Sequence, residues 1–326
     1  MKKIFNIAKL SFTSGVHLGS GTGEEYDRSM RILHSDTISA ALCSNWATND
    51  KDVEGFMRSF RVSSAIPIYN DRVFLPLPLD KSCITLVEYP DGTQHKRIKR
   101  LQWIEQPLWE QLSREGKIEI SISMISGCGT AIALEDAQDI YIQKQTLEQK
   151  VAVVDGADNE PYYFDRIFFG KGVKLGVLYE SSRTQDFENT FTLLADSGIG
   201  TRRTVGNGLF SAEFDTIEID VAEEADGIQL LSLWLPKNEE WCVETMSNSC
   251  YDIISRGGYT SGSSDATQRN RIKKSVNMVV AGSIIATTTL EGNIVDVRPE
   301  GFVAHPVWRD GRAFYLPFKK LYNNEM

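Results

Sequence analysis

The sequence predicts an α+β protein in which strands and amphipathic helices alternate. Residues 3–14 have the pattern of a strand, and apolar residues four positions apart at Ile38, Leu42 and Trp46 predict a helix after it. Further strands and a second helix precede a strand that begins at Phe210. The resulting order of strand, helix, strand, strand, helix, strand is that of a ferredoxin-like unit.

The early elements of this unit follow from local signals. Ser35 is the expected N-cap of the first helix, and Asp36 suits the positive end of that helix. Residues 63–69 and 73–78 are extended and contain prolines, so we expect them at a sheet edge or in loops. Residues 95–114 are expected to hold a short helix that carries several large apolar side chains.

A long β-hairpin is predicted in the middle of the chain. Residues 138–169 contain alternating runs on either side of the polar segment 155–160, which is typical of two strands joined by a polar tip. Residues 172–179 are expected to form another strand. Phe187 and Phe191 then fall on one face of a predicted helix.

The 326 residues have room for two domains, and we place the boundary so that the first spans 1–215 and the second 216–326. Hydrophobic residues make up 41% and charged residues 24%, as in a globular protein with a substantial core. No apolar run is as long as a membrane span, so we expect no membrane contact. The five cysteines are dispersed without a Cys-x-x-Cys pair, which favours the cytoplasm and predicts no thiolate zinc site. We also expect no cofactor.

The net charge of −9 counts against nucleic-acid binding when taken alone. The charge is distributed unevenly, however. Basic residues cluster at 95–100, at Arg202 and Arg203, and at 269–274, whereas acidic residues are concentrated in 213–226. This asymmetry indicates one basic face and one acidic face.

The segment Gly198–Phe210 contains four glycines together with Arg202 and Arg203, and it joins a predicted helix to a predicted strand. A P-loop and a dinucleotide-binding loop both need the opposite order, a strand followed by a helix. Two interpretations remain open. The loop either cradles phosphate groups with its backbone and arginines, or it is a glycine-rich turn with solvated arginines.

Eight segments, in order along nearly the whole chain, resemble the RAMP proteins of type III-A CRISPR interference (Csm) complexes. They are 17–19, 34–37, 63–67, 74–76, 196–210, 256–259, 281–283 and 305–311. The resemblance is greatest to the fourth subunit of that complex. Thr201 stands where many relatives have a glycine, and Ala281 stands where an acidic residue is usual.

This resemblance implies two ferredoxin-like (RRM-like) domains and a role in antiviral defence. Proteins of this family bind the repeat-derived 5′ handle of the CRISPR RNA (crRNA). They dock against the large polymerase/cyclase subunit and the first backbone RAMP subunit. A β-hairpin thumb meets the guide–target duplex, which brings target RNA close. We assign the thumb to Gln143–Asp165, with residues 80–100 as the second choice.

The resemblance also implies which residues contact RNA. Backbone groups and hydroxyls of the loop would bind phosphates, and arginines would neutralise charge or stack on a base. The predicted RNA-binding residues are His17, Gly198, Gly200, Thr201, Arg202, Arg203, Thr204, Gly206, Gly208, Arg256 and Tyr259.

Family members are not known as nucleases, so we expect no catalytic residue and no metal. A related RAMP branch processes CRISPR RNA with a histidine near the position of His17, which makes an endoribonuclease the alternative function. No second histidine pairs with His17 in the sequence, and Asp36 alone does not make a metal site. His17 remains either structural or an RNA contact. Arg256 and Tyr259 either clamp the RNA or form an ordinary turn with the tyrosine in the core.

Overall fold

The computed structural model describes residues 1–19, 26–49, 52–89, 95–152, 160–260 and 271–319. The helices are α1 Ser35–Trp46, α2 Val53–Arg58, α3 His95–Arg100, α4 Gln106–Glu115, α5 Thr184–Ser197 and α6 Val243–Ser247. None of the described helices combines the length and the apolar character that a membrane-spanning helix needs.

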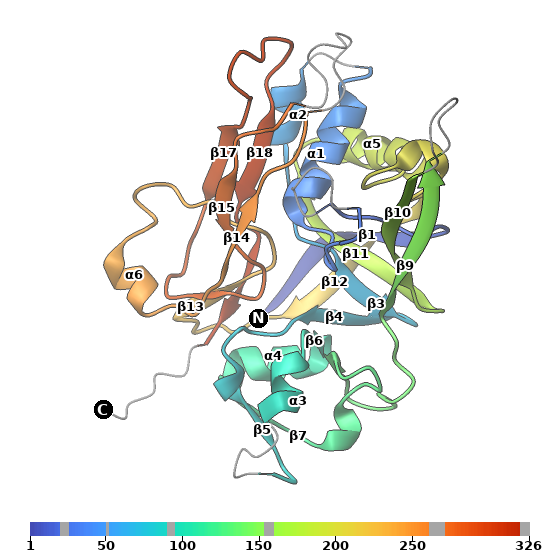
Figure 1. Ribbon diagram of the computed structural model, residues 1–326. Coiled ribbons are helices and arrows are strands. Elements are labelled where there is room, and N and C mark those ends of the chain that lie inside the picture. Colours follow the sequence, from blue (N-terminus) through green and yellow to red (C-terminus); the bar gives the residue numbers. More distant parts are fainter. Residues whose placement is uncertain (20–25, 50–51, 90–94, 153–159, 261–270, 320–326) are drawn as a thin grey trace.

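Helices occur together with strands that pair mostly antiparallel, which confirms the α+β class (Figure 1). In the N-terminal half they are β1 Lys2–Phe12, β2 Phe60–Val62, β3 Ile66–Tyr69, β4 Arg72–Pro76, β5 Ile84–Leu86, β6 Trp103–Glu105, β7 Ile118–Ile120, β8 Ala131–Ile132, β9 Gln143–Ala152, β10 Glu160–Phe169 and β11 Val173–Ser181. The others are β12 Phe210–Asp220, β13 Gly227–Leu230, β14 Ile253–Arg256, β15 Val276–Val279, β16 Ile284–Ile285, β17 Gly292–Asp296, β18 Trp308–Arg312 and β19 Tyr315–Phe318.

One large sheet organises the molecule, with the strand order β12-β1-β11-β3-β4-β6-β8 and with β2 also paired to β11. Strand β1 is antiparallel to both β12 and β11, and β11 is antiparallel to β2. Strands β1, β2, β11 and β12 belong to this sheet, and α1 and α5 come between them along the chain. The two long helices pack on one face, where Ile38, Leu42 and Phe191 are buried against Leu10 and Val177.

The two proline-containing stretches form β3 and β4 inside the sheet, so their prediction as edge or loop was wrong. Strand β3 pairs with β11 at Pro67 but with β4 only at Ile68 and Tyr69. Strand β4 pairs at Pro76 only with Trp103 of β6. Each proline therefore lies where its strand has a neighbour on one side only, a position at which a residue without an N–H is tolerated.

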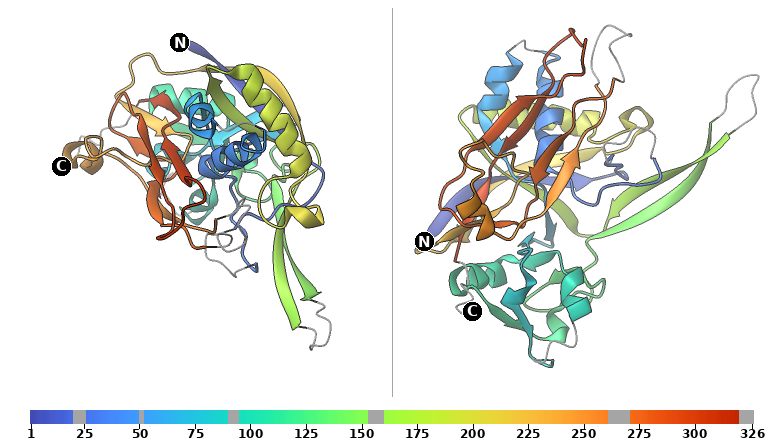
Figure 2. Two further views of the ribbon diagram at one scale, coloured as in Figure 1. Left: turned by 90° about the horizontal axis from the view of Figure 1, so that it is seen from above. Right: turned by 60° about the vertical axis from the view of Figure 1, so that its left-hand side comes forward.

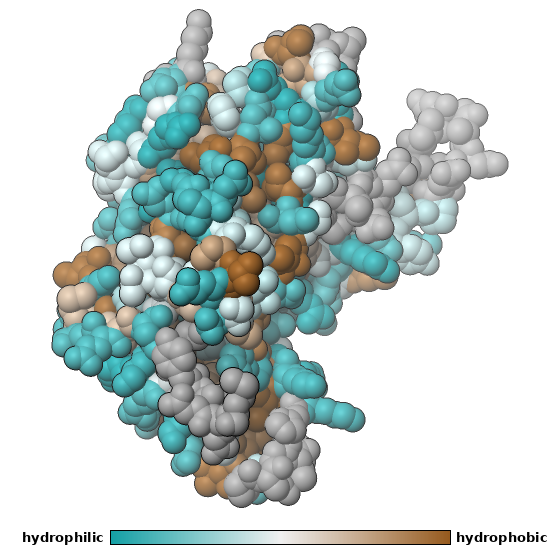
Figure 3. Space-filling view, turned by 90° about the vertical axis from the view of Figure 1, so that its left-hand side faces the viewer, coloured by the Kyte–Doolittle hydropathy of each residue, from teal (hydrophilic) through white to brown (hydrophobic). Residues whose placement is uncertain are grey.

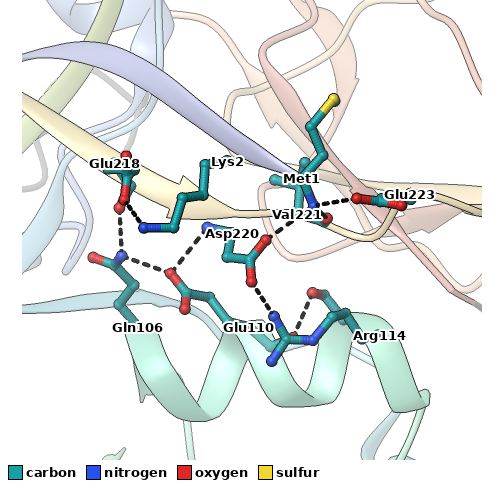
Figure 4. A network of polar contacts seen from close by, with 10 residues as sticks. Met1, Lys2, Gln106, Glu110, Arg114, Glu218, Asp220, Val221 and Glu223 are labelled. Atoms are coloured by element: carbon teal, nitrogen blue, oxygen red, sulfur yellow. Dashed lines mark hydrogen bonds and ion pairs between the residues drawn. The ribbon is translucent and has the colours of Figure 1, made fainter.

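Residues 81–142 contribute a small lobe below the sheet in Figure 1, with α3, α4, β5 and β7. The single helix predicted over 95–114 is two helices, α3 and α4, with strand β6 between them. Helix α4 joins the lobe to the sheet through polar contacts (Figure 4). Gln106 donates to the carbonyl oxygen of Glu218 at 2.7 Å, and Arg114 lies 2.5 Å from the carboxylate of Asp220.

The C-terminal strands form three short sheets, with orders β16-β13-β19, β14-β15 and β17-β18. Figure 3 shows that the face they present is largely hydrophilic, with separate hydrophobic patches. Beneath this face, Trp234 and Leu230 are fully buried in a core of their own. Strand β18 lies beside α1, and Ser39 donates to the carboxylate of Asp310 at 3.1 Å across that contact.

Strands β9 and β10 form the predicted long hairpin, paired in register from Gln143↔Phe169 to Ala152↔Glu160. Figure 2 shows the hairpin extending away from the body of the molecule. The segment at its tip, 153–159, lies outside the described residues. The base of the hairpin is attached to the segment that follows β1. There, Val16 and Ile167 exchange two backbone hydrogen bonds of 2.9 and 2.8 Å.

Candidate nucleic-acid interface

The glycine-rich segment connects α5 to β12, as the sequence predicts. Its four glycines have positive φ, +75° at Gly198, +96° at Gly200, +82° at Gly206 and +72° at Gly208. At three of them a Cβ atom would lie within 3 Å of a backbone carbonyl oxygen, and only Gly206 has open space around it. These three glycines are therefore required by the packing of the loop against neighbouring backbone.

Backbone hydrogen bonds hold the base of the loop in place. The N–H of Ile199 donates to the carbonyl of Gly208 at 2.9 Å, and the N–H of Gly208 donates to Gly15 at 3.0 Å. The N–H groups of Gly198 and Gly206 also donate within the protein. Three of the four glycine N–H groups are thus already used, which differs from their predicted role as phosphate donors. The glycines shape the loop instead.

The tip of the loop, Thr201–Gly206, is exposed. Arg202 has a left-handed backbone with φ +56°, which is uncommon for a residue other than glycine and turns the loop outward. In the described part of the chain, neither Arg202 nor Arg203 has an ion-pair partner. The tip therefore carries two positive charges that no described carboxylate pairs with, on a fixed base.

Arg202 lies over two aromatic rings that sequence reasoning did not select. Its guanidinium carbon is 4.6 Å from the centroid of Tyr26 and 5.5 Å from that of Tyr162 in β10. Such cation–π contacts orient a guanidinium without neutralising its charge. Arg166 of the hairpin also reaches the loop, donating to the amide oxygen of Asn207 at 3.4 Å. The loop tip and the hairpin base thus form one surface of arginine and aromatic side chains.

His17 lies beneath this surface and not on it. Only 1% of the side chain is exposed, and its ring stacks on Phe164 with centroids 4.9 Å apart. Its Nδ1 is 2.7 Å from the carbonyl oxygen of Asp165, and its own carbonyl accepts the N–H of Thr201 at 3.0 Å. The structure thus gives His17 a structural position between the loop and the hairpin, in place of the predicted contact with phosphate or ribose.

Arg256 is also buried, with 6% of its surface exposed. Its guanidinium donates to both carboxylate oxygens of Asp36, at 2.9 and 3.0 Å, and to the hydroxyl of Thr37 at 2.9 Å. Tyr259 is half-buried and forms a bridge to Ile272. Among the described residues no hydrogen bond, ion pair or ring contact joins Arg256 or Tyr259 to the glycine loop. The structure therefore pairs Arg256 with Asp36 and brings neither Arg256 nor Tyr259 to the glycine loop.

The start of α1 differs from its prediction. The N-cap is His34, without a side-chain capping bond, and the hydroxyl of Ser35 instead accepts the N–H of Leu233 at 3.0 Å. Burial alone would raise the pKa of Asp36, but Arg256 and Arg309 override it and hold the pKa at about 2. Asp36 is therefore an anchor for arginines of β14 and β18, which the first-turn pattern alone did not reveal.

Comparisons with known proteins show what the chain is similar to. Residues 223–318 match the family model of the CRISPR Csm4 C-terminal domain. The chain is 24% identical over 243 residues to the CRISPR system Cms protein Csm4 of Thermococcus onnurineus, covering 72% of each chain. It is 22% identical over 389 residues to the Csm4 of Methanocaldococcus jannaschii, covering 98% of each.

Solved structures share the fold. A chain of the Csm3-Csm4 subcomplex of a type III-A CRISPR-Cas interference complex superimposes with a TM-score of 0.65 at 18% identity, covering 96% of this chain and 99% of that chain. A chain of a Csm1-Csm4 cassette in complex with cA4 gives 0.63 at 18% identity, covering 98% and 100%. The resemblance found in the sequence is thereby confirmed: residues 223–318 match the Csm4 C-terminal domain, and the whole chain is similar to Csm4 proteins.

Proposed function

We propose that this protein is a non-catalytic subunit of a type III-A CRISPR effector complex and binds the 5′ handle of the crRNA. The observation that carries this proposal is the exposed pair Arg202 and Arg203, held on a rigid glycine loop beside Tyr26 and Tyr162. Positive charge combined with aromatic faces is the combination that binds single-stranded RNA. The proposal includes two ferredoxin-like domains and a location in the cytoplasm, where the five free cysteines stay reduced.

The surface would recognise backbone and stacked bases more than sequence. Arg202 and Arg203 would neutralise phosphates, and the hydroxyls of Thr201 and Thr204 would donate to phosphate oxygens. Since Arg202 already lies over Tyr26, a base that stacks on the guanidinium would extend that stack. Such contacts bend a short strand around the loop without cleaving it.

The proposed protein partners come from the similar structures, in which Csm4 chains are bound to Csm3 or to Csm1. By analogy this chain would dock against the large polymerase/cyclase subunit and the backbone RAMP subunit. The hairpin β9–β10, which extends from the body next to the proposed RNA surface, would lie near the target RNA (Figure 2).

The first test compares two double variants in the assembled complex. Replacing Arg202 and Arg203 with alanine is expected to weaken binding of handle RNA at least tenfold, since charge-assisted contacts to phosphate are lost. Replacing the exposed Lys117 and Lys319 with alanine removes the same charge elsewhere and is expected to have little effect. Equal binding by wild type and the Arg202/Arg203 variant would remove the loop from the site.

The endoribonuclease alternative is tested with the isolated chain. A general base must reach the proton that it removes, and the His17 side chain is 1% exposed with Nδ1 beside a carbonyl oxygen. We therefore expect repeat RNA to stay intact when it is incubated with the protein. Cleavage that disappears in a His17→Ala variant would support the nuclease, and absence of any RNA crosslink to the loop would support a scaffold that binds only proteins.

A further inference from the structure

A cavity of about 560 Å³ lies where several distant segments meet, apart from the glycine loop. Its volume is in the range of small-molecule sites. Its wall is mostly apolar and includes Leu77, Leu101, Trp103, Ile254 and Val280. Five segments that carry the sequence resemblance, 34–37, 63–67, 74–76, 256–259 and 281–283, supply further lining residues. The proposed function does not use these segments.

The ionised side chains that line the cavity are basic in the described part of the chain. Lys81, Lys99 and Arg256 line it, and among the described residues no Asp or Glu does, although the chain carries a net charge of −9. Arg256 is paired with Asp36, but the two lysines have no ion-pair partner in the described part of the chain. Burial lowers the pKa of Lys81 to about 8, because the ammonium loses water and the attraction of the neighbouring Asp80 does not make up for that loss. The cavity is therefore suited to a ligand that is largely apolar and carries negative charge.

A short segment of the chain connects the proposed RNA surface to the cavity. Tyr26 lies under Arg202, and four residues later Met30 lines the cavity, followed by Ile32 and His34. Four residues span at most about 14 Å even when fully extended. A strand bound at Arg202 therefore needs only a few nucleotides to reach the cavity.

We propose that this cavity binds one nucleotide of the RNA, with the base against the apolar wall and its phosphate at Lys81 and Lys99. This inference rests on the proposed function and adds to it a second contact point, separate from the loop. A base taken out of its stack is commonly held in this way, between apolar or aromatic side chains. Trp103 is the aromatic side chain that lines the cavity and would make such a contact.

The test uses the full chain and single-stranded repeat-derived RNA that carries 4-thiouridine at one position at a time. We expect one position to crosslink to residues 99–103 and another to the glycine loop. Filling the cavity with Ala281→Trp is expected to abolish the first crosslink and weaken RNA binding about tenfold, within the effect of losing one stacked base. The control Ala40→Trp places the same side chain on the exposed face of α1.

A second pair of variants tests the cavity without the risk that the large side chain of Ala281→Trp misfolds the protein. Lys99→Ala and Lys96→Ala both alter exposed positions of α3, but only Lys99 lines the cavity. Lys99→Ala alone is expected to weaken RNA binding. Suppose that the wild-type chain binds RNA and crosslinks at the loop, and that neither Ala281→Trp nor Lys99→Ala changes RNA binding. The proposed nucleotide pocket is then wrong, and the proposed function stands.

Two other outcomes separate the remaining explanations. Failure of the wild-type chain to bind RNA at all contradicts the proposed function, and the pocket with it. Binding of free AMP that Ala281→Trp removes, without any RNA crosslink in residues 99–103, overturns the assignment to RNA and indicates a site for a free nucleotide.

Discussion

The carboxylate of Asp36 receives two hydrogen bonds from the guanidinium of Arg256, at 2.9 and 3.0 Å, and both side chains are buried. Arg309 donates to the same carboxylate and also to the carbonyl of Gly257 at 2.8 Å. Asp36 belongs to α1, whereas the arginines come from β14 and β18. One buried negative charge thus holds the C-terminal strands against the first helix.

Replacing Asp36 with asparagine is expected to destabilise the protein by about 3–5 kcal/mol, because two buried guanidinium groups lose their counter-charge. The measurement is the urea dependence of unfolding, followed by tryptophan fluorescence. Asp139→Asn, at an exposed position, is the matched control and should change stability little. A loss below 1 kcal/mol in the Asp36 variant would contradict a central role for this ion pair.

The same carboxylate predicts how stability depends on acid. The pKa of Asp36 is about 2 in the folded protein, below its ordinary value near 3.9, so its contribution is complete above about pH 4. It is lost as the pH falls toward 2, and the difference corresponds to roughly 2 kcal/mol. Urea unfolding midpoints measured between pH 5 and pH 2 should fall more steeply for wild type than for Asp36→Asn. Parallel curves would argue against the low pKa.

Gly208 and Gly206 provide a matched test of the loop. Both have positive φ, but a Cβ at Gly208 would lie 1.9 Å from the carbonyl oxygen of Ile199, while at Gly206 nothing lies within 4 Å. Gly206→Ala should therefore cost only the left-handed backbone penalty of about 1–2 kcal/mol. Gly208→Ala should cost more and should also weaken RNA binding, since the arginines lose their support. Thermal unfolding and RNA titration of both variants measure this, and equal effects would show that the close approach is unimportant.

The hairpin offers a test of stacking at the RNA surface. Tyr162 faces Arg202, and its neighbour Tyr163 points to the opposite face of β10 and is 54% exposed. Tyr162→Leu is expected to weaken handle RNA binding by about 1–3 kcal/mol, the range measured for loss of one base–aromatic contact. Tyr163→Leu serves as the control. A larger effect of the control in fluorescence-anisotropy titrations would place the RNA on the other face.

Salt dependence separates charge from stacking. Each phosphate contact to a single strand contributes about 0.7 to the slope of log affinity against log salt. Replacing Arg202 and Arg203 with alanine should therefore flatten that slope by about 1.4, if each contacts one phosphate. Tyr162→Leu should shift the line without changing its slope. Titrations at several potassium chloride concentrations give both values, and an unchanged slope in the arginine variant would mean that these side chains do not bind phosphate.

Much of the fold could be predicted because periodic patterns report local structure. The apolar spacing of α1 and α5 and the alternation of β1 and β9–β10 each identified an element correctly. The error at β3 and β4 arose because proline was taken as evidence against an internal strand. Adjacent strands are offset along their length, so only some residues of an internal strand are paired on both sides. This offset is set by partner strands that are distant in sequence.

The candidate site was predictable in part for a related reason. Glycines with arginines in one loop are visible in the sequence, but Tyr26 and Tyr162 are 136 residues apart in the chain and meet only through folding. The burial of His17 and Arg256 was equally hidden, because it depends on Phe164 and on Asp36. The alternation of Tyr162 and Phe164 in β10 was the one signal that pointed to an aromatic face on the hairpin.

The ion pair of Asp36 also bears on how the chain is made. Asp36 precedes Arg256 by 220 residues and Arg309 by 273. During synthesis α1 therefore leaves the ribosome long before either of its cationic partners exists, and until then its carboxylate must remain hydrated. Helix α1 is consequently expected to reach its final position only after β18 has been translated. Truncated chains that end before Arg256 should therefore be sensitive to proteolysis around α1.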